Sequence, residues 1–452
     1  MNQKKEWDYD LVIVGAGVSG AAQFFASGAY TNLQKVALVE KEGAAGLINS
    51  SPVNNSQTLH EGDIETNYNL EKATAVKHKA FFTRSYVENK DIDNLYLKNP
   101  KAVFGVGETE YNLLSERFES FKELFPTLQR LERDEFAKIE PKMFEGRDAN
   151  EKVLGLYNTE GMTVNFGLLA KSLVSDGQKA FTPTDDRRGD IFFNTKVEDV
   201  TKEGEGYVID LGDRKVTARF VSFCTGAHSM YFAKKFGLEM VSQTSLLLVA
   251  GNFYHSPKYV QTKVYTVQNP KLPFAAVHVD PDILEDDKNR YGPTTRIVIT
   301  LERGRLKTIF EYLTTLSPLL GSLLAYVRIL FDRDFFFYAL RHNVLFSVPV
   351  LGNRLFVNEA RKIIPTLKYS EMVRAKGQGG VRPQIVKTNE KNPLNLGEAK
   401  LRTDTMMFNV TPSPGATTCM YNGLIDVRAI TQTLEASFDE EKVANDFGKT
   451  ID

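Results

Sequence analysis

The segment Asp10-Leu-Val-Ile-Val-Gly-Ala-Gly-Val-Ser-Gly20 decides the fold of this chain. Its run from Leu11 to Val14 is apolar and mostly β-branched, which is typical of a strand buried on both faces. The glycine pattern GxGxxG follows directly, and Ala21 to Ala26 continues at helical spacing. A strand, a glycine turn and a helix in this order predict a Rossmann-like dinucleotide-binding fold, with the helix N-terminus facing a pyrophosphate.

Each glycine of this pattern has its own task. We expect Gly15 to permit the tight turn, Gly17 to let the backbone approach the pyrophosphate, and Gly20 to let the helix pack closely against the strand. Ser19, in the same turn, is a further expected cofactor contact. The pattern by itself is weak evidence, because chance matches are common.

A second strand supplies the context that the glycine pattern needs. The segment from Lys35 to Glu40 is apolar and ends in an acid, with Glu40 twenty residues beyond Gly20. A carboxylate at this spacing accepts hydrogen bonds from the ribose hydroxyls of a dinucleotide. The sequence therefore predicts a cofactor site that includes Glu40 and Lys41, rather than a cofactor-free α/β turn.

Later segments favour FAD over NAD. Residues 191–210 predict a short strand and a hairpin partner, with Val197 near the cofactor. Residues 218–227 predict an apolar strand that ends in Thr225 and Gly226. Flavoproteins of the D-amino-acid-oxidase type have a similar strand, whose Thr-Gly turn passes the cofactor; a plain buried strand is the alternative interpretation.

The C-terminal region predicts a second turn that leads into a helix. Residues 406–410 are strand-like, residues 411–418 form a loop, and residues 419–434 have helical spacing. Backbone amides in this loop suit the flavin oxygen that gains negative charge on reduction. The expected contacts are Ser413, Pro414, Gly415, Ala416 and Thr417.

Composition excludes several classes of protein. The 452 residues carry a formal net charge of −1, with 42% hydrophobic and 25% charged residues, which is ordinary for a globular protein. This balance gives no indication of nucleic-acid binding. Cys224 and Cys419 form no CxxC pair, and no His/Cys/Asp/Glu cluster has metal-ligand spacing, so we expect neither a disulfide framework nor a metal site.

The sequence predicts neither a secretory signal nor a membrane-spanning helix. Residues 1–10 are polar and lack an apolar core followed by a cleavage site. No stretch of about 18 uncharged apolar residues occurs. We therefore expect the chain to fold in the cytoplasm.

The predicted cofactor segments lie near residues 10–60, 190–230 and 400–420, so the cofactor domain must be discontinuous. We expect an α/β fold whose Rossmann-like FAD-binding domain, of the D-amino-acid-oxidase and glutathione-reductase type, comprises residues 1–84, 156–240 and 371–452. Residues 85–155 and 241–370 should form an inserted α+β substrate domain. Strand-like runs at 246–250, 263–267 and 296–300 predict an antiparallel sheet there, as a roof for the substrate cavity.

The chain resembles one family over nearly its whole length, the malate:quinone oxidoreductases, specifically their shorter bacterial branch. The most specific segments are residues 55–62 with 65–68, 263–278, 377–384 and 412–417. The first segment also resembles FAD enzymes for L-2-hydroxyglutarate, so it indicates the superfamily more than the substrate. The longer branch of the family has its histidine in a Pro-His-Leu-Asp-Thr-Arg setting, whereas the setting here is Ala276-Val-His-Val-Asp-Pro281.

The resemblance implies non-covalent FAD, oxidation of L-malate to oxaloacetate by hydride transfer, and electron delivery to membrane quinone. It also implies that Asn55, Ser56 and Gln57 lie near the isoalloxazine, and that the protein sits peripherally on the inner face of the cytoplasmic membrane. Two alternatives stay open. One is an FAD enzyme for another 2-hydroxy acid, L-2-hydroxyglutarate or L-lactate, and the other is a flavin-binding redox sensor without catalysis.

Oxidation of a 2-hydroxy acid requires a base for the hydroxyl proton, and histidine suits it because its ordinary pKa is about 6.5. His278 is the first candidate, because it follows the strand-like run 273–277 and precedes Asp280, and the resemblance selects it too. A structural or orienting role is its alternative. His60 is the second candidate base, and a flavin-orienting role is also open for it.

Arginine suits the two carboxylates of malate, because a guanidinium binds them bidentately and keeps its charge. Arg382, in the glycine-rich segment 377–384, is the first choice. Arg296 is the second, and Thr294 could add a hydroxyl contact.

Residues 301–346 have an unusual apolar composition. Residues 306–331 mix apolar side chains with Lys307, Glu311 and Arg328, and four consecutive aromatic residues occupy 335–338. Helices packed on the substrate domain are one interpretation. The other is a surface that dips into the membrane interface, where aromatic side chains anchor and basic groups meet lipid headgroups.

Overall fold

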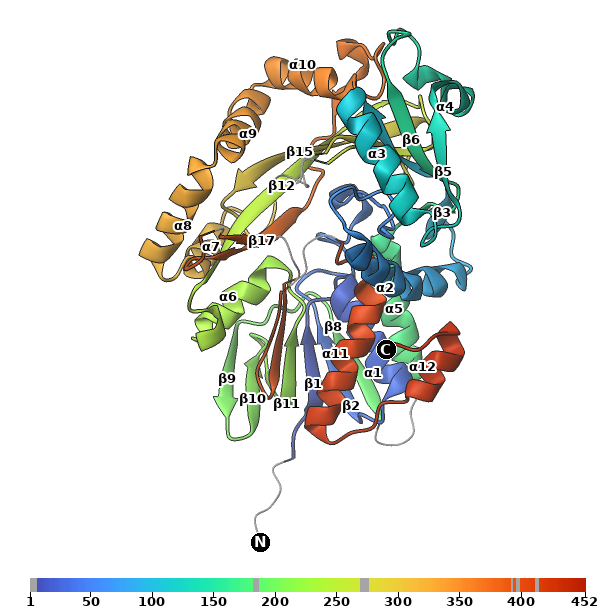
Figure 1. The fold of residues 1–452 in the computed structure, drawn as a ribbon. Coiled ribbons are helices and arrows are strands. Elements are labelled where there is room, and N and C mark those ends of the chain that lie inside the picture. Colours follow the sequence, from blue (N-terminus) through green and yellow to red (C-terminus); the bar gives the residue numbers. More distant parts are fainter. Residues whose placement is uncertain (1–5, 182–186, 269–275, 392, 396–398, 411–413) are drawn as a thin grey trace.

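The computed structural model describes residues 6–181, 187–268, 276–391, 393–395, 399–410 and 414–452. Two large sheets organise these residues, one in the lower and one in the upper half of Figure 1. The glycine-turn segment lies in the first sheet.

The first sheet is mainly parallel, in the order β19-β20-β11-β1-β2-β8. Its strands are β1 (Tyr9–Val14), β2 (Lys35–Val39), β8 (Arg188–Phe192), β11 (Lys215–Phe223), β20 (Met406–Val410) and the antiparallel edge strand β19 (Ala399–Arg402). An antiparallel hairpin of β9 (Asp199–Glu203) and β10 (Gly206–Asp210) pairs with β11.

β1 is buried on both faces, as predicted. Leu11 and Ile13 belong to one hydrophobic core, and Val12 and Val14 belong to another. Successive side chains of a strand point to opposite faces, which produces this division. The first core lies under α1 (Val18–Tyr30), α2 (Leu70–Glu88), α5 (Phe166–Ala180), α11 (Cys419–Leu434) and α12 (Glu440–Phe447), while α6 (Ala227–Lys235) covers the other face (Figure 1).

The second sheet has ten described strands, in the order β18-β17-β12-β15-β14-β13-β4-β6-β5, with β16 beside β12. Neighbouring strands are antiparallel except for β13 and β4. The bounds are β4 (Lys101–Val106), β5 (Leu128–Glu132), β6 (Val153–Asn158), β12 (Thr244–Pro257), β13 (Lys263–Thr266), β14 (His278–Pro281), β15 (Lys288–Val298), β16 (Val373–Arg374), β17 (Val381–Lys387) and β18 (Leu394–Asn395). The predicted antiparallel sheet is therefore present.

The domain boundary expected at residue 371 does not match the sheet. β17 pairs with β12, and Val381 and Ile385 of β17 pack in one core with Leu246 and Leu248 of β12. The boundary was expected at residue 371 because the glycine-rich loop at 377–380 was assigned to the cofactor domain. The apolar side chains of β17, after this loop, instead pack on β12 of the second sheet. The second sheet thus extends to β18, and it also includes β6, which crosses the boundary expected at residue 155.

Four helices, α7 (Thr308–Thr315), α8 (Leu319–Phe331), α9 (Arg333–Asn343) and α10 (Pro349–Ala360), follow one another along one side of the second sheet (Figure 1). Ala325, Ile329, Phe335 and Ala339 attach α8 and α9 to Leu247 and Val386 of that sheet. No single helix in the described ranges is long and apolar enough to span a membrane, but α7 and α8, bent by 89°, together have sufficient length and composition.

Smaller elements complete the described structure. They are α3 (Glu108–Phe121), α4 (Arg133–Ile139), the paired strands β3 (Tyr96–Lys98) and β7 (Met162–Val164), and the short 3-10 helices η1 (Pro52–Asn54), η2 (Pro141–Met143), η3 (Glu239–Val241), η5 (Leu345–Ser347) and η6 (Tyr369–Glu371).

Candidate active site

A cavity of about 830 Å³ lies at the carboxyl ends of the parallel strands. Val14, Val39 and Thr225, at or just beyond the ends of β1, β2 and β11, line it together with Gly17 at the start of α1. Ligands of open parallel sheets bind at this edge, where the glycine turn opens into the helix. The cavity is thus placed where the sequence predicts a dinucleotide.

The glycines of the turn are required by close backbone contacts. Gly15 has φ +98°, and a Cβ added to it would lie 2.6 Å from the carbonyl oxygen of Cys224. A Cβ on Gly20 would lie 1.9 Å from the carbonyl oxygen of Gly15. Gly15 therefore fixes the approach of β1 to β11, and Gly20, which does not line the cavity, acts through helix packing.

Glu40 is held in place at the end of β2. Its Oε2 accepts a hydrogen bond from the backbone N–H of Ala16 at 2.7 Å, and its Oε1 accepts one from Glu42 at 2.9 Å. Each carboxylate oxygen has a further lone pair, so the group can still accept from ribose hydroxyls. The carboxylate lines the cavity beside the glycine turn.

The expected cofactor residues divide into two groups. Those that line the cavity are Gly15, Gly17, Ser19, Glu40, Lys41, Val197, Thr225, Gly226, Gly415 and Ala416. Those that do not line it are Gly20, Asn55, Ser56, Gln57, Pro414 and Thr417. Ser413 lies outside the described residues.

Asn55 and Gln57 make hydrogen bonds that hold their own loop in place. Asn55 Nδ2 donates to the carbonyl oxygens of Asn49, Ser50 and Ser51 at 2.9 to 3.2 Å. Gln57 Nε2 donates to Asp282 Oδ1 at 3.0 Å, which ties the loop to the segment that follows β14. These contacts position the loop between the cavity and the second sheet.

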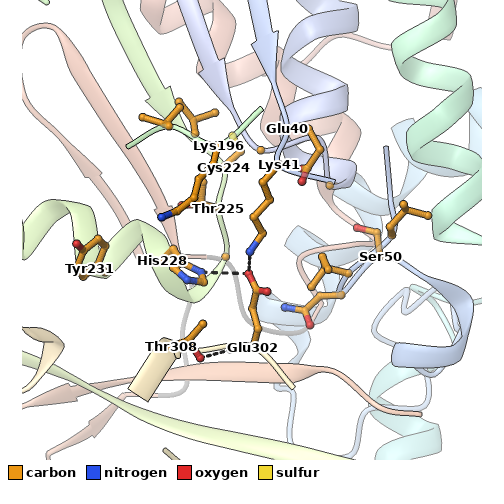
Figure 2. A pocket seen from close by; sticks show the side chains of 18 of the residues that line it. Glu40, Lys41, Ser50, Lys196, Cys224, Thr225, His228, Tyr231, Glu302 and Thr308 are labelled. Atoms are coloured by element: carbon orange, nitrogen blue, oxygen red, sulfur yellow. Dashed lines mark hydrogen bonds and ion pairs between the residues drawn. The ribbon is translucent and has the colours of Figure 1, made fainter. Parts of the chain in front are cut away.

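The outer wall of the cavity comes from residues that sequence reasoning missed. Glu302 pairs with Lys41, and Figure 2 shows these two side chains meeting beside His228. His228 Nε2 lies 2.9 Å from Glu311 Oε2, and Arg305 Nη2 donates to Glu42 Oε1 at 2.5 Å. No motif marks these residues, because the tertiary fold alone brings α6 and the segment 302–311 together.

The two candidate bases lie in one cluster around Tyr265. The Tyr265 ring stacks on His278 with a centroid distance of 4.6 Å, and its edge meets His60 at 6.0 Å. The register of β13 and β14 pairs Tyr265 with His278, so the sheet itself fixes the stack. Tyr265 lies inside the segment 263–278 that carries the family resemblance, which was the available signal for it.

His278 is enclosed. It is the first residue of β14 rather than the residue after a strand, and the run expected before it lies largely outside the described residues. Its Nδ1 lies 2.8 Å from Asp280 Oδ2. Burial lowers the pKa of His278, although Asp280 acts in the opposite direction, so the neutral imidazole is favoured.

His60 has a different setting. Its Nδ1 lies 2.5 Å from Glu65 Oε1, and its side chain is 15% exposed. The backbone N–H of His60 donates to Thr417 Oγ1 at 3.0 Å, and Ser56 Oγ lies 3.5 Å from Nε2. Thr417 and Ser56 thus surround the candidate base, although neither lines the cavity.

The two expected arginines point to opposite faces of the second sheet. Arg382 pairs in register with Val249, and Arg296 pairs with the next residue of β12, Ala250. Neighbouring positions of a strand alternate between faces, so the two guanidinium groups do not form a common clamp. The sequence could not show this, because the offset depends on how both strands pair with β12.

Arg382 belongs with the histidine cluster. Burial lowers its pKa, and Tyr265 and Tyr338 act in the opposite direction. Arg382 makes no ion pair within the part of the chain that the structure describes. A half-buried guanidinium without a carboxylate partner suits a substrate carboxylate.

Arg296 belongs to a separate group of cations. Its pKa is lowered by burial and by Arg374, and the charges of Arg296 and Arg374 act likewise on Arg303. Arg303 donates to Asn252 Oδ1 at 2.5 Å, and Asn252 Nδ2 donates to Thr294 Oγ1 at 3.3 Å. Thr294 therefore contacts this group rather than the histidine cluster.

Comparison with known proteins identifies the family. The family described as malate:quinone oxidoreductase matches residues 7–310. This chain belongs to the malate:quinone oxidoreductase family. It is 37% identical to a probable malate:quinone oxidoreductase of Campylobacter jejuni, over 97% of this chain and 99% of the relative, and 38% identical to a malate:quinone oxidoreductase of Helicobacter pylori, over 97% and 98%.

Solved structures agree on the fold of this malate:quinone oxidoreductase family member. An L-α-glycerophosphate oxidase of Mycoplasma pneumoniae with FAD bound has a TM-score of 0.66 at 16% identity, covering 95% of both chains. A glycine oxidase of Geobacillus kaustophilus has a TM-score of 0.62 at 18% identity, covering 94% of this chain and 95% of that chain. At these identities the likeness shows the fold alone, and it confirms the predicted fold class.

The cavity of this family member fits FAD. The glycine turn leaves backbone open beneath the start of α1, Glu40 offers acceptors at one end, and Gly415 and Ala416 lie before α11. Its volume is within the range of about 300 to 1,000 Å³ that small-molecule sites span. Within the described ranges, no group of three or more His, Cys, Asp or Glu side chains could hold a metal ion.

Proposed function

We propose that this chain oxidises L-malate to oxaloacetate and passes the electrons to a membrane quinone. Non-covalently bound FAD would supply the acceptor for the hydride from C2. Membership of the malate:quinone oxidoreductase family supports the reaction, and the observation that carries it is the cluster in which His60 and His278 contact the Tyr265 ring.

We assign the base to His60, because the base must carry positive charge after it accepts the hydroxyl proton. Glu65, 2.5 Å from Nδ1, stabilises that charge and leaves Nε2 for the substrate. Burial disfavours the charged form of His278, as its lowered pKa shows. His278 instead orients Tyr265 by stacking against it.

Arg382 would bind a substrate carboxylate. Its half-buried guanidinium has no described carboxylate partner, and an uncompensated charge removed from water is costly. An incoming carboxylate would compensate this charge and hold C2 in register with the flavin. Arg296 lies on the opposite face of the sheet, so a direct role for it in the same substrate pose is not part of this proposal.

Turnover on a panel of 2-hydroxy acids tests the substrate. With a soluble quinone analogue as acceptor, L-malate should give a kcat/KM higher than L-2-hydroxyglutarate or L-lactate. A higher kcat/KM for L-2-hydroxyglutarate or L-lactate would identify that acid as the preferred substrate. No turnover with any acid, in protein that retains FAD, would favour the redox-sensor alternative.

We also propose that the surface of α7 to α10 contacts the membrane on the cytoplasmic side. The most exposed apolar side chains there are Phe331 at 84%, Phe310 at 77%, Leu306 at 73% and Leu320 at 71%. The others are Leu313, Leu319, Leu323, Leu324, Val327, Leu330, Phe336, Phe337, Leu340, Val344, Leu345, Val348, Val350 and Leu351. So large an apolar surface on one side marks an interaction site.

Charge supports a lipid partner for this surface. Lys307, Arg328, Arg333 and Arg341 are exposed on the same helices, where they can meet anionic headgroups while the apolar side chains enter the interface. Phe335 is an exception among the aromatic residues 335–338, because it is only 5% exposed and packs in the core beneath α8. The proposed contact therefore relies on Phe310, Leu320 and Phe331.

A further inference from the structure

An ionic network extends behind His60, away from the cavity. Glu61, Asp63 and Glu65 alternate along the loop that follows His60, and all three act on the pKa of Lys101, which is raised despite complete burial. Lys101 Nζ lies 2.9 Å from Asp63 Oδ1 and 2.7 Å from Glu61 Oε2. The loop thus wraps three carboxylates around one buried ammonium.

The network has one end at the candidate base and the other near the surface. Glu65 Oε1 contacts His60 Nδ1 at 2.5 Å, and Glu61 accepts hydrogen bonds from Arg84 at 2.8 and 2.9 Å. Exposure of the side chains rises from 0% at Asp63 to 15% at Glu61, 18% at Arg84 and 32% at Glu88. The charged groups around Lys101 therefore lie between the cluster of candidate bases and solvent.

Asp63 is the member most suited to hold a transferable proton. Burial raises the pKa of Asp63, against the opposing effect of Lys101, and the charges of Glu65 and Glu61 act in the same direction as burial. Asp63 Oδ1 lies 2.9 Å from Lys101 Nζ, and Asp63 Oδ2 accepts a hydrogen bond from Asn158 Nδ2 at 2.7 Å. Glu65 Oε2 is buried and makes no hydrogen bond with a described residue, so this oxygen is open to a proton or to a bridging water.

We propose that Glu65, Asp63, Lys101 and Glu61 carry the substrate proton from His60 to the surface at Arg84. This inference rests on the proposed function, with His60 as base. Arg117 of α3 also faces the loop, donating to the carbonyl oxygens of Gly62 and Glu65 at 3.1 and 2.8 Å, and it balances the negative charge of the carboxylates.

The step balances with groups already named. When the C2 hydride leaves for the flavin, the O–H bond of the substrate breaks and its electron pair forms the new C=O bond. The proton passes to His60 Nε2, while the proton on Nδ1 passes to Glu65. From Glu65 the proton passes through a bridging water to Asp63. The Lys101 ammonium, which contacts both Asp63 and Glu61, gives one of its protons to Glu61 and is reprotonated from Asp63, so one proton reaches solvent for each hydride transferred.

Proton release measured beside flavin bleaching tests the relay. Anaerobic mixing of the FAD-loaded enzyme with L-malate in weak buffer, with a pH-indicator dye, reports both events in one experiment. In the wild type, flavin bleaching and proton release should occur at the same rate. In Asp63→Asn the first flavin should still bleach, because His60 can hold one proton, whereas proton release should lag by about tenfold or more, as expected for loss of a proton-transfer group.

Two further variants keep the test decisive. Glu61→Gln, at the surface end, should give the same lag and serves where Asp63→Asn does not fold. Asp176→Asn breaks a comparable ion pair with Lys90 at 2.6 Å, far from His60, and should give no lag. The infrared carbonyl band of a protonated carboxyl, present in the wild type, should be absent from Asp63→Asn.

The outcomes separate the relay from the function. Simultaneous bleaching and proton release in both Asp63→Asn and Glu61→Gln would overturn the relay and leave His60 releasing its proton directly to solvent. A lag of equal size in Asp176→Asn would also overturn it, because the effect would then be general. Wild-type protein whose flavin L-malate does not bleach would instead overturn the proposed function.

Discussion

At the scale of single residues, the two histidines each have a carboxylate at Nδ1 but differ in exposure. Glu65 at His60 and Asp280 at His278 give both rings a carboxylate, but only His60 combines it with partial exposure. Each dyad fixes which ring nitrogen is left for other partners. The roles proposed for His60 as base and His278 as orienting residue rest on this difference.

His60→Ala should lower the rate of flavin reduction by about 10²- to 10⁴-fold, the usual range for loss of a general base. FAD should still bind, because His60 does not line the cavity. His278→Ala should have a smaller effect, through a less ordered Tyr265. Stopped-flow flavin absorbance measures the reduction rate of both variants. A larger loss of rate in His278→Ala than in His60→Ala would make His278 the base and His60 the orienting residue.

Arg382→Lys should raise KM for L-malate much more than it lowers kcat. An ammonium keeps the charge but cannot reproduce the planar, bidentate fork of a guanidinium. Arg296→Lys is the matched control, because that residue lies on the opposite face of the sheet. Equal KM values for wild type and Arg382→Lys would remove Arg382 from the substrate site.

At the scale of elements, the segment from Glu302 to α7 closes the outer wall of the cofactor cavity. It is held to the cofactor side by the pair of Glu302 with Lys41 (Figure 2), and by the pairs of Arg305 with Glu42 and Glu311 with His228. The same segment leads into the apolar surface. The wall of the cofactor cavity and the proposed membrane contact therefore share one element.

Glu302→Gln combined with Glu311→Gln should speed FAD dissociation by several-fold, because the wall loses two of its three charged attachments. Fluorescence of released FAD after dilution measures this rate. Glu359→Gln is the control, since Glu359 pairs with Arg341 at 2.8 Å on α9 and α10, away from the cavity. An unchanged dissociation rate would mean that these pairs do not close the cavity.

The stability of the protein at low pH should depend on His342, which lies in α9. Its ring stacks on Tyr338 at 4.0 Å and meets Phe346 at 4.5 Å, and burial lowers its pKa to about 3. Between pH 6.5 and 3 the unfolded state binds a proton that the folded state refuses, so the free energy of unfolding falls as pH falls through this window. The slope is about 1.4 kcal/mol per pH unit for one group.

His342→Phe keeps a ring in this position and removes the titration. The difference in free energy of unfolding between wild type and variant, from urea titrations at several pH values, should change steadily from pH 6 to pH 4 and be constant above pH 7.5. A difference that does not vary with pH would show that His342 does not titrate on unfolding.

Elements marked by a motif of consecutive residues were predictable from sequence, whereas contacts between side chains of distant segments were not. The glycine turn specified β1 and α1, because its spacing is a property of consecutive residues. The placement of Arg382 opposite Val249, of Tyr265 on His278, and of Lys101 among three carboxylates depends on strand register and loop packing between distant segments. The outer wall at Glu302 was missed for the same reason.

At the scale of the whole molecule, the apolar surface of α7 to α10 runs along one side of the second sheet, with α7 next to α6 at the end toward the first sheet (Figure 1). Phe310→Ser, Leu320→Ser and Phe331→Ser together should weaken liposome binding and quinone reduction. Reduction of a small water-soluble dye should persist, because hydride transfer occurs elsewhere. High salt should release part of the wild-type protein, since headgroup attraction is screened.

The matched control for this surface replaces three exposed apolar residues elsewhere with serine. Leu97, Leu113 and Leu284 are 37%, 39% and 48% exposed and lie outside α7 to α10. Their variant should bind liposomes as the wild type does. Equal binding by the Phe310, Leu320 and Phe331 variant would place the membrane contact on another surface.

The central claim is that L-malate gives its hydride to FAD in this chain, and anaerobic bleaching of the bound flavin tests it most directly. Purified protein should carry one FAD that acid precipitation releases to the supernatant. L-Malate, added without oxygen or quinone, should bleach its flavin absorbance fully and at a catalytically competent rate, with one oxaloacetate formed for each flavin. Flavin that stays oxidised with L-malate but is bleached by L-lactate or L-2-hydroxyglutarate, or by none of the three, would contradict the account.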